Sequence, residues 1–329
     1  MPHAPSSAPA LPPALAGRLA VPAIAAPMFL VSGPDLVVET CRGGILGTFP
    51  ALNARTSALY GDWLDAIAAR TAALPGAAPF GVNLIVHKSN PRLQADLAVT
   101  VERKVPLVIT SLGAVREVVE AVHGYGGLVF HDVISRRHAE KAAEAGVDGI
   151  IAVSAGAGGH AGTLSPFALI GEIRRFFAGP LVLSGAISTG AHIAAAEVMG
   201  ADLAYLGTRF IATKESLAPP EFKEMMLAAK AEDILYTDAI SGVNANFLKP
   251  SILRAGLDPA DLKTHGGLDM ANEAKAWRDV WSAGHGVGAI ADIPPAAELC
   301  ARLAREYDAA LDAAAARAAR RHRPVAAAS

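Results

Sequence analysis

The sequence predicts an α/β protein of the (β/α)8 TIM-barrel class, with a smaller, mostly helical region over the barrel mouth. Three observations lead to this prediction. Short apolar runs alternate with helix-period segments eight times between residues 21 and about 212. The runs are apolar throughout, as is typical of parallel strands that are covered on both faces. The first strand is followed by residues 26–33, which lack the glycine pattern of a dinucleotide-binding open sheet, the main rival fold.

The predicted elements follow the chain in order. The eight strands are expected at 24–28, 45–49, 80–85, 107–110, 128–131, 149–153, 181–184 and 203–206. The helices between them include 34–41, 63–71, 114–123, 136–145, 166–177 and 191–199. Two helices are followed by a glycine and then an aspartate, in 146–148 and 200–202, where the glycine ends the helix and the next residues lead into a strand.

Four segments are expected. Residues 1–17, rich in alanine and proline, form a flexible arm, and residues 18–212 form the barrel core. Residues 213–292 mix charge with proline, glycine and asparagine and give helical patterns without strand runs, so they are expected to cover the mouth as a substrate or lid region. Residues 293–329 form a C-terminal helix, over 296–320, and a basic tail that is interpreted as solvated.

Composition excludes several function classes. The net charge is −2, and the absence of a basic face argues against a nucleic-acid partner. The apolar runs are too short for a membrane span, and the N-terminus does not resemble a signal peptide. Cys41 and Cys300 lie far apart, which fits a cytoplasmic protein. No histidines and carboxylates share a metal-like spacing, so no metal is assigned. The oligomeric state stays open, a homo-oligomer included.

The loop after the sixth strand carries the clearest sign of chemistry. It reads Ser154-Ala155-Gly156-Ala157-Gly158-Gly159-His160-Ala161-Gly162. Its glycines let the backbone pass close to a flat ligand or a phosphate. His160 is flanked by small residues and can move a proton near neutral pH, so proton transfer or substrate orientation is favoured over a bracing role. His138 and His192 are expected on the surface, and His87 in a loop near the opening.

The loops after the last two predicted strands form the usual phosphate site of a barrel. Gly185 and Gly207 would offer backbone N–H groups, Thr208 would add a hydroxyl, and a nearby helix N-terminus would add a positive dipole end. Tight turns that bind nothing are the alternative. The occurrence of both loops at the correct pair of strands favours a phosphate.

Residues at the ends of three other strands are further candidates. Pro27 stiffens the end of the first strand and Met28 offers an adaptable wall for a flat ring, although ordinary packing would also account for them. Asn83 is polar in an otherwise buried strand, so it needs a hydrogen-bond partner in a ligand or a neighbouring loop. His131 and Asp132 end the fifth strand and are expected near the mouth.

Taken together, these motifs resemble the nitronate monooxygenases, formerly called 2-nitropropane dioxygenases. The resemblance covers residues 21–212 and touches 280–285. It implies an FMN-dependent barrel, with His160 near the reactive face of the flavin as the presumed base or orienting group. The residues that it assigns to the cofactor are Ala26, Pro27, Met28, Asn83, Asp132, Gly159, Ser184, Gly185, Ala186, Gly207 and Thr208.

Three positions depart from the family's pattern. Ala25 stands where relatives often have glutamine, and Ala186 follows Gly185 where a second glycine is frequent. Asp132 stands where some members carry lysine. A carboxylate near a reduced, anionic flavin is disfavoured by like-charge repulsion, so either Asp132 points away or the surroundings of the ring differ.

The resemblance implies oxidation of alkyl nitronates, and of nitroalkanes once deprotonated, with O2 to carbonyl compounds and nitrite. An FMN-dependent NAD(P)H:quinone or enoyl-thioester reductase is the first alternative, because such enzymes share much of this outline. A flavin-free lyase or isomerase acting on a sugar phosphate, or a binding protein, is the second.

Overall fold

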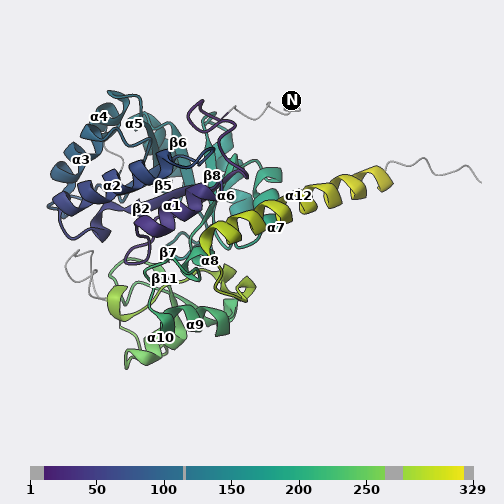
Figure 1. Ribbon diagram of the computed structural model, residues 1–329. Helices are drawn as coiled ribbons and strands as arrows, with labels where there is room; N and C mark the ends of the chain where they lie inside the picture. The colour runs from purple at the N-terminus through teal and green to yellow at the C-terminus, as the bar shows by residue number, and fades with distance from the viewer. Residues whose placement is uncertain (1–10, 114–115, 264–276, 322–329) are drawn as a thin grey trace, which may run out of the picture.

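The computed structural model describes residues 11–113, 116–263 and 277–321, which form a closed barrel and a smaller unit at one end of it (Figure 1). The barrel order is β1-β2-β3-β4-β5-β6-β8-β9, with every neighbouring pair parallel. The strands are β1 (Ala23–Ala25), β2 (Leu46–Pro50), β3 (Phe80–Ile85), β4 (Leu107–Ser111), β5 (Leu128–Val133), β6 (Gly149–Val153), β8 (Leu181–Ser184) and β9 (Leu203–Leu206). All eight predicted strands are confirmed, and the fold is the predicted (β/α)8 barrel.

Both faces of each strand are buried, which explains the continuous apolar runs. In β1, Ile24 belongs to the cluster inside the barrel, together with Leu46 and Phe130. Its neighbours Ala23 and Ala25 belong to the cluster between the barrel and the helices. Successive side chains of a strand point to opposite faces. Apolar residues are therefore favoured on both faces, inside for the barrel filling and outside for the helix layer.

The helices of the outer layer are α1 (Pro34–Arg42), α2 (Ser57–Ala72), α3 (Leu93–Glu102), α4 (Arg116–His123), α5 (Arg136–Ala145), α6 (Pro166–Arg174) and α7 (Gly190–Val198), and the short α8 (Thr208–Ile211) follows β9. The predicted helices are confirmed, and α3 is additional; positions 114 and 115 of one predicted helix lie outside the described residues. Local signals fix α5: the Ser135 hydroxyl accepts from the His138 N–H, and Gly146 ends the helix at φ 88°.

The start of the chain differs from the expected flexible arm. Residues 1–10 lie outside the described part, but Leu15 is only 1% exposed and packs into the cluster inside the barrel. Leu11, Leu19 and Leu128, the first residue of β5, pack against the same cluster. Residues 11–19 therefore close the end of the barrel at which the strands begin, because the open barrel end needs an apolar cover.

The expectation that residues 213–292 contain no strands is wrong. β10 (Ile234–Thr237) and β11 (Ala245–Leu248) pair antiparallel, and β11 also pairs with β7 (Gly159–His160). The described helical parts of this region include α9 (Pro220–Ala228), α10 (Lys249–Arg254), residues 277–279 and the 3-10 turns η2 (Ala231–Asp233) and η3 (His285–Ala289). The strands are four residues long, and β11 contains an asparagine, so neither strand produces a recognisable apolar run.

The C-terminal helix α12 (Ala296–Arg321) packs on α1 and α7 and then extends beyond the body of the molecule (Figure 1). Its closest approach is at Gly190, where a Cβ would overlap the backbone of Leu303 and Tyr307. Cys41 of α1 and Cys300 of α12 are both buried in this contact region. No helix within the described ranges has the length and apolar character needed to cross a membrane.

Candidate active site

A cavity of about 1420 Å³ lies at the carboxyl ends of the barrel strands. A second cavity, of about 20 Å³, adjoins it and shares the walls formed by Gly158, Ser184, Tyr205, Gly207 and Thr208. Every site residue predicted from the sequence lines one of the two. The large cavity contacts Ala26, Pro27, Met28, Asn83, Asp132, Gly159, His160, Ser184, Gly207 and Thr208; the small one contacts Gly185 and Ala186 as well. Residues far apart in sequence thus meet at one site.

His160 is held by the smaller unit as well as by the barrel. It lies on β7, where its backbone pairs with Ala245 of β11. The preceding Gly159 has φ 71°, and its N–H donates to Ser282 Oγ over 2.7 Å. The imidazole packs edge-to-face against Trp277, with 5.4 Å between the ring centroids. The position of this side chain therefore depends on three segments of the chain.

A row of polar side chains crosses the cavity wall on the ends of β3, β4 and β5. The Asn83 amide donates to the backbone oxygen of Ile109 (3.2 Å) and to Ser111 Oγ (2.7 Å). Ser111 Oγ in turn donates to Asp132 Oδ2 over 2.5 Å. Asn83 thus finds protein partners, as its burial requires. The same chain of bonds fixes the Asp132 carboxyl in the wall.

Asp132 lines the cavity instead of pointing away from it. Its Oδ1 is buried and has no hydrogen-bond partner in the described part of the chain. Burial raises the pKa of this carboxyl to about 6, against the opposing effects of the Ser111 hydrogen bond and the His160 charge. The hydroxyl of Tyr205, from β9, is likewise buried without a partner among described residues. The cavity wall therefore offers two unsatisfied polar atoms to a ligand.

His131 also lines the cavity but belongs to the barrel wall. It is 5% exposed, and its Nδ1 lies 2.7 Å from Thr110 Oγ1. Burial lowers its pKa to about 4, so the imidazole is neutral at pH 7. His87, expected near the opening, does not line the cavity; His138 does, from α5 at the rim.

The small cavity has the character of an anion site. It lies between the loops after β8 and β9, where Ala186 has φ 54° and Gly185 has φ 140°. A Cβ at Gly185 would overlap the Ser154 hydroxyl, so only glycine fits there. Ser188 Oγ is buried in the wall and has no partner in the described residues. This space, its backbone lining and its unsatisfied hydroxyl suit a phosphate.

Residues 282–286 close the small cavity from the other side. The Gly284 N–H donates to Thr208 Oγ1 over 2.9 Å, and the His285 N–H donates to the backbone oxygen of Gly156 over 2.9 Å. A Cβ on Gly284 would overlap the Gly156 oxygen, and one on Gly286 would overlap Ser188 Oγ. Backbone packs on backbone here, so the loops cannot spread apart without breaking these bonds.

Two charged side chains near the loops after β8 and β9 are already paired with protein groups. The N–H of Gly190, at the start of α7, donates to the Glu306 carboxylate of α12 over 2.8 Å. This helix end is therefore occupied by a protein carboxylate. Arg209 is 3% exposed and turns to Asp292, with 2.6 Å between Nη2 and Oδ1. Arg209 thus joins the barrel to the C-terminal segment.

The wall formed by Pro27 and Met28 is held by Asn53 from the loop after β2. The Asn53 amide nitrogen donates to the backbone oxygens of Met28 (3.0 Å) and Ser32 (2.8 Å). Its oxygen accepts from the Leu30 N–H over 2.9 Å, where Leu30 has φ 61°. One side chain therefore stabilises a strained turn directly behind the wall.

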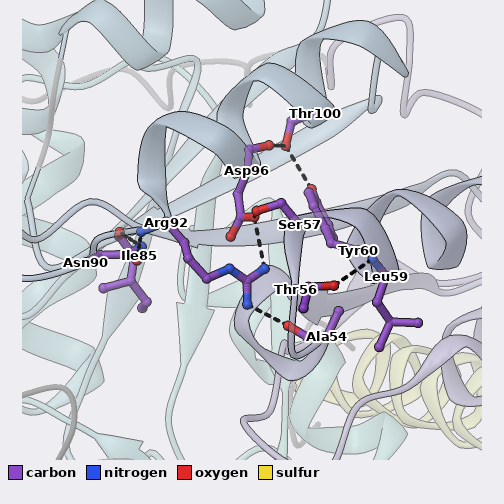
Figure 2. Close-up of polar contacts among 10 residues, drawn as sticks. All are labelled: Ala54, Thr56, Ser57, Leu59, Tyr60, Ile85, Asn90, Arg92, Asp96 and Thr100. Atoms are coloured by element: carbon purple, nitrogen blue, oxygen red, sulfur yellow. Dashed lines mark hydrogen bonds and ion pairs between the residues drawn. The ribbon is translucent and has the colours of Figure 1, made fainter.

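The loop after β2 is held in the same way by Arg92, at the start of α3 (Figure 2). Its guanidinium donates to the backbone oxygen of Ala54 over 2.6 Å and to Asp96 over 2.9 Å. Asp96 is 1% exposed and also accepts from the Ser57 hydroxyl. The first three loops of the mouth are thus tied in sequence, from the Met28 turn through Asn53 to Arg92.

Sequence reasoning missed several residues of the site. Ser111, Ser188 and Tyr205 line the cavities, and Asn53 and Ser282 position their walls. Tyr205 and Ser111 have a signal that could have been used, because each is a polar residue at the end of a barrel strand. Ser282 lies in the segment 280–285 that the resemblance touches, whereas Asn53 has no signal, since its role depends on contacts across the fold.

The family model described as nitronate monooxygenase matches residues 16–306. A nitronate monooxygenase of Paraburkholderia phytofirmans is 30% identical, over 88% of this chain and 93% of its own. The solved structure of a nitroalkane oxidase from Streptomyces ansochromogenes has a TM-score of 0.78 at 27% identity and covers 92% of this chain and 99% of that one. A Rhodococcus jostii dehydrogenase, whose name gives an indene carboxyl-CoA as substrate, is 27% identical over 71% of this chain and 64% of its own.

Proposed function

This chain belongs to the nitronate monooxygenase family of oxidoreductases, and from that premise we propose that it oxidises alkyl nitronates with O2 in an FMN-dependent reaction that yields carbonyl compounds and nitrite. The observation that carries the proposal is the shared cavity: it joins the His160 imidazole, a wall for a flat ring and a small anion site. The similarity to a nitroalkane oxidase supports the same chemistry.

The residues present fit FMN. The backbone of Gly185, Ala186, Gly207 and Thr208 would hold its phosphate, and Ser188 Oγ would gain a partner there. Pro27, Met28 and the polar row of Asn83, Ser111 and Asp132 would border the ring, with Gly159 and Ser184 along the cofactor. When bound, FMN supplies the electron acceptor and the centre at which O2 reacts.

His160 would act on the substrate. A nitroalkane must lose a proton from the carbon next to the nitro group, and an imidazole in the same cavity can take that proton. A nitronate has already lost it, so His160 would only orient the anion by a hydrogen bond. The barrel end is closed by Leu15 and its neighbours, so the reaction takes place at the mouth.

The first test is the absorption spectrum of the purified protein without oxygen, before and after addition of a simple alkyl nitronate. Flavin bands that bleach on addition support both the cofactor and electron transfer from the nitronate. Flavin bands that do not change, or a colourless protein that fails to bind added FMN, contradict the proposal.

The second test separates the two roles of His160. We expect His160→Ala to reduce turnover of neutral nitroalkane far more, by about 100-fold, than turnover of preformed nitronate. His87→Ala is the matched control, because His87 does not line the cavity and should leave both rates unchanged. Equal losses on both substrates with His160→Ala would refute the base role and leave orientation.

The size of the cavity also admits a second candidate. About 1420 Å³ would have to hold FMN as well as a substrate, and the related Rhodococcus protein is named as a dehydrogenase of a CoA thioester. An NAD(P)H-dependent reductase of a quinone or enoyl thioester would use this room. Bleaching of the flavin by NAD(P)H but not by nitronate would select this candidate.

A further inference from the structure

The Asp132 carboxyl is held in the cavity wall by a chain of hydrogen bonds. Its Oδ2 is fixed by Ser111 over 2.5 Å, and Ser111 is fixed by Asn83 over 2.7 Å. Its Oδ1 is buried and unsatisfied within the described part of the chain, although the residue lines the cavity. A buried carboxyl oxygen without a partner costs free energy, so this oxygen is available to a ligand or a proton.

Charged and titratable groups lie next to Asp132 and around the rim of its cavity. His160 of β7 and Tyr205 of β9 interact with it electrostatically. His131 precedes it on β5 and is neutral at pH 7. The cationic and titratable side chains that line the same cavity from other segments are Arg92, His138, Lys141, Arg254 and Arg278. Among described residues, neither arginine nor lysine forms an ion pair with Asp132.

The two redox forms of a flavin differ in charge. The oxidised ring is neutral, whereas the ring that has taken up two electrons loses a proton near neutral pH and becomes an anion. A carboxylate fixed in the wall of a low-dielectric cavity repels an anion and leaves a neutral ring nearly unaffected. The Asp132 carboxylate therefore affects binding of the reduced, anionic ring and leaves binding of the oxidised, neutral ring nearly unchanged.

We propose that Asp132 makes this site discriminate between the redox forms of its flavin by charge: the carboxylate weakens binding of the reduced form, and its protonation removes that penalty. The inference rests on the proposed function only in taking the ligand of the cavity to be a flavin. The sequence left two possibilities open: Asp132 points away from the ring, or the surroundings of the ring differ. Asp132 lines the cavity and its Oδ1 can take up a proton, so the second possibility is the one proposed.

The test is equilibrium binding of oxidised and of anaerobically reduced FMN to the protein without cofactor. It compares wild type with Asp132→Asn at about pH 8 and about pH 5, on either side of the carboxyl pKa of about 6. At about pH 8 we expect Asp132→Asn to bind reduced FMN at least about tenfold more tightly than wild type, relative to oxidised FMN. At about pH 5 the two proteins should agree, because Asp132 and the reduced ring are then both neutral. Asp62→Asn, which removes an exposed carboxylate outside the cavity, should behave as wild type.

A second variant, Ser111→Ala, tests the inference without replacing Asp132. The Ser111 hydrogen bond lowers the pKa of Asp132, so Ser111→Ala should move the pH at which reduced FMN begins to bind weakly to a higher value. The same relative affinity in wild type and Asp132→Asn at about pH 8, or an unmoved pH dependence in Ser111→Ala, overturns the inference. If wild type binds oxidised FMN but either of these two outcomes is found, only this inference is refuted. A protein that binds neither form of FMN refutes the proposed function and this inference with it.

Discussion

Replacement of Asn53 tests whether the wall behind the Met28 turn is built by one side chain. Asn53→Ala removes three hydrogen bonds, of 3.0, 2.8 and 2.9 Å, to Met28, Ser32 and Leu30. Each contributes about 1 kcal/mol net, and the bond to Leu30 is exposed, so the expected loss is about 2–3 kcal/mol. Leu30 at φ 61° adds to the effect, because its turn then lacks the bonds that maintain it.

The assay combines urea denaturation of the protein without cofactor and equilibrium binding of FMN. Asn53→Ala should lower both the unfolding free energy and the affinity for FMN. Thr56→Ala is the matched control: it removes the N-cap of α2, whose hydroxyl accepts from the Leu59 N–H. We expect this control to cost about 1 kcal/mol of stability with unchanged FMN affinity, because Thr56 lies outside the cavity.

Asn53→Asp separates the donor from the acceptor. The carboxylate keeps an oxygen for the Leu30 N–H but places its other oxygen against the backbone oxygens of Met28 and Ser32. This variant should therefore be at least as unstable as Asn53→Ala at pH 7. An Asn53→Asp protein with wild-type stability and FMN affinity would refute the reasoning, since the amide donor would then contribute nothing.

Three further predictions concern stability. The pKa of Asp132 is about 6 in the folded protein, against an ordinary value of 3.8. Its contribution to the free energy of unfolding is therefore complete below about pH 3.8 and is lost as the pH rises through about 6. The unfolding free energy of Asp132→Asn, relative to that of wild type, should therefore increase by up to about 3 kcal/mol between pH 4 and pH 8 in urea denaturation. A difference that does not change with pH would contradict this. Gly185→Ala should lose stability and FMN affinity, because the new Cβ would overlap the Ser154 hydroxyl and the residue has φ 140°. Gly207→Ala is the control and should keep its stability, because its new Cβ would lie 3.5 Å from the Ala26 Cβ. Equal thermal midpoints for the two variants would show the steric argument to be wrong. Leu15→Ala should cost about 2–5 kcal/mol by calorimetry, and a change below 1 kcal/mol would mean that the barrel end closes without it.

The barrel could be predicted because its signal is repeated and local. Each strand carries apolar residues on both faces, and each helix carries its own start and stop, as Ser135 and Gly146 do for α5. The positions of the site residues followed from the barrel, because the carboxyl ends of all eight strands meet at one face. For this reason Asn83, His160 and Thr208 could be brought together from sequence alone.

The remaining features depend on contacts that no local pattern records. β11 pairs with β10 and also with β7, some 85 residues earlier in the chain, and the second pairing leaves no trace in the local sequence. Leu15 looks like part of a loose arm until the barrel end that it covers is present. The sequence allowed the Asp132 side chain either to face the cavity or to point away from it. Its orientation depends on the hydrogen bond from Ser111 on the neighbouring strand, which the sequence does not reveal.

The backbone contacts of residues 282–286 have a consequence for synthesis on the ribosome. Gly156 and Thr208 receive their partners from His285 and Gly284, and Gly190 receives Glu306 later still. The eight barrel strands have all emerged long before these partners are made. Nascent chains that end before Gly284 therefore contain all eight barrel strands but lack the backbone contacts that close the small cavity.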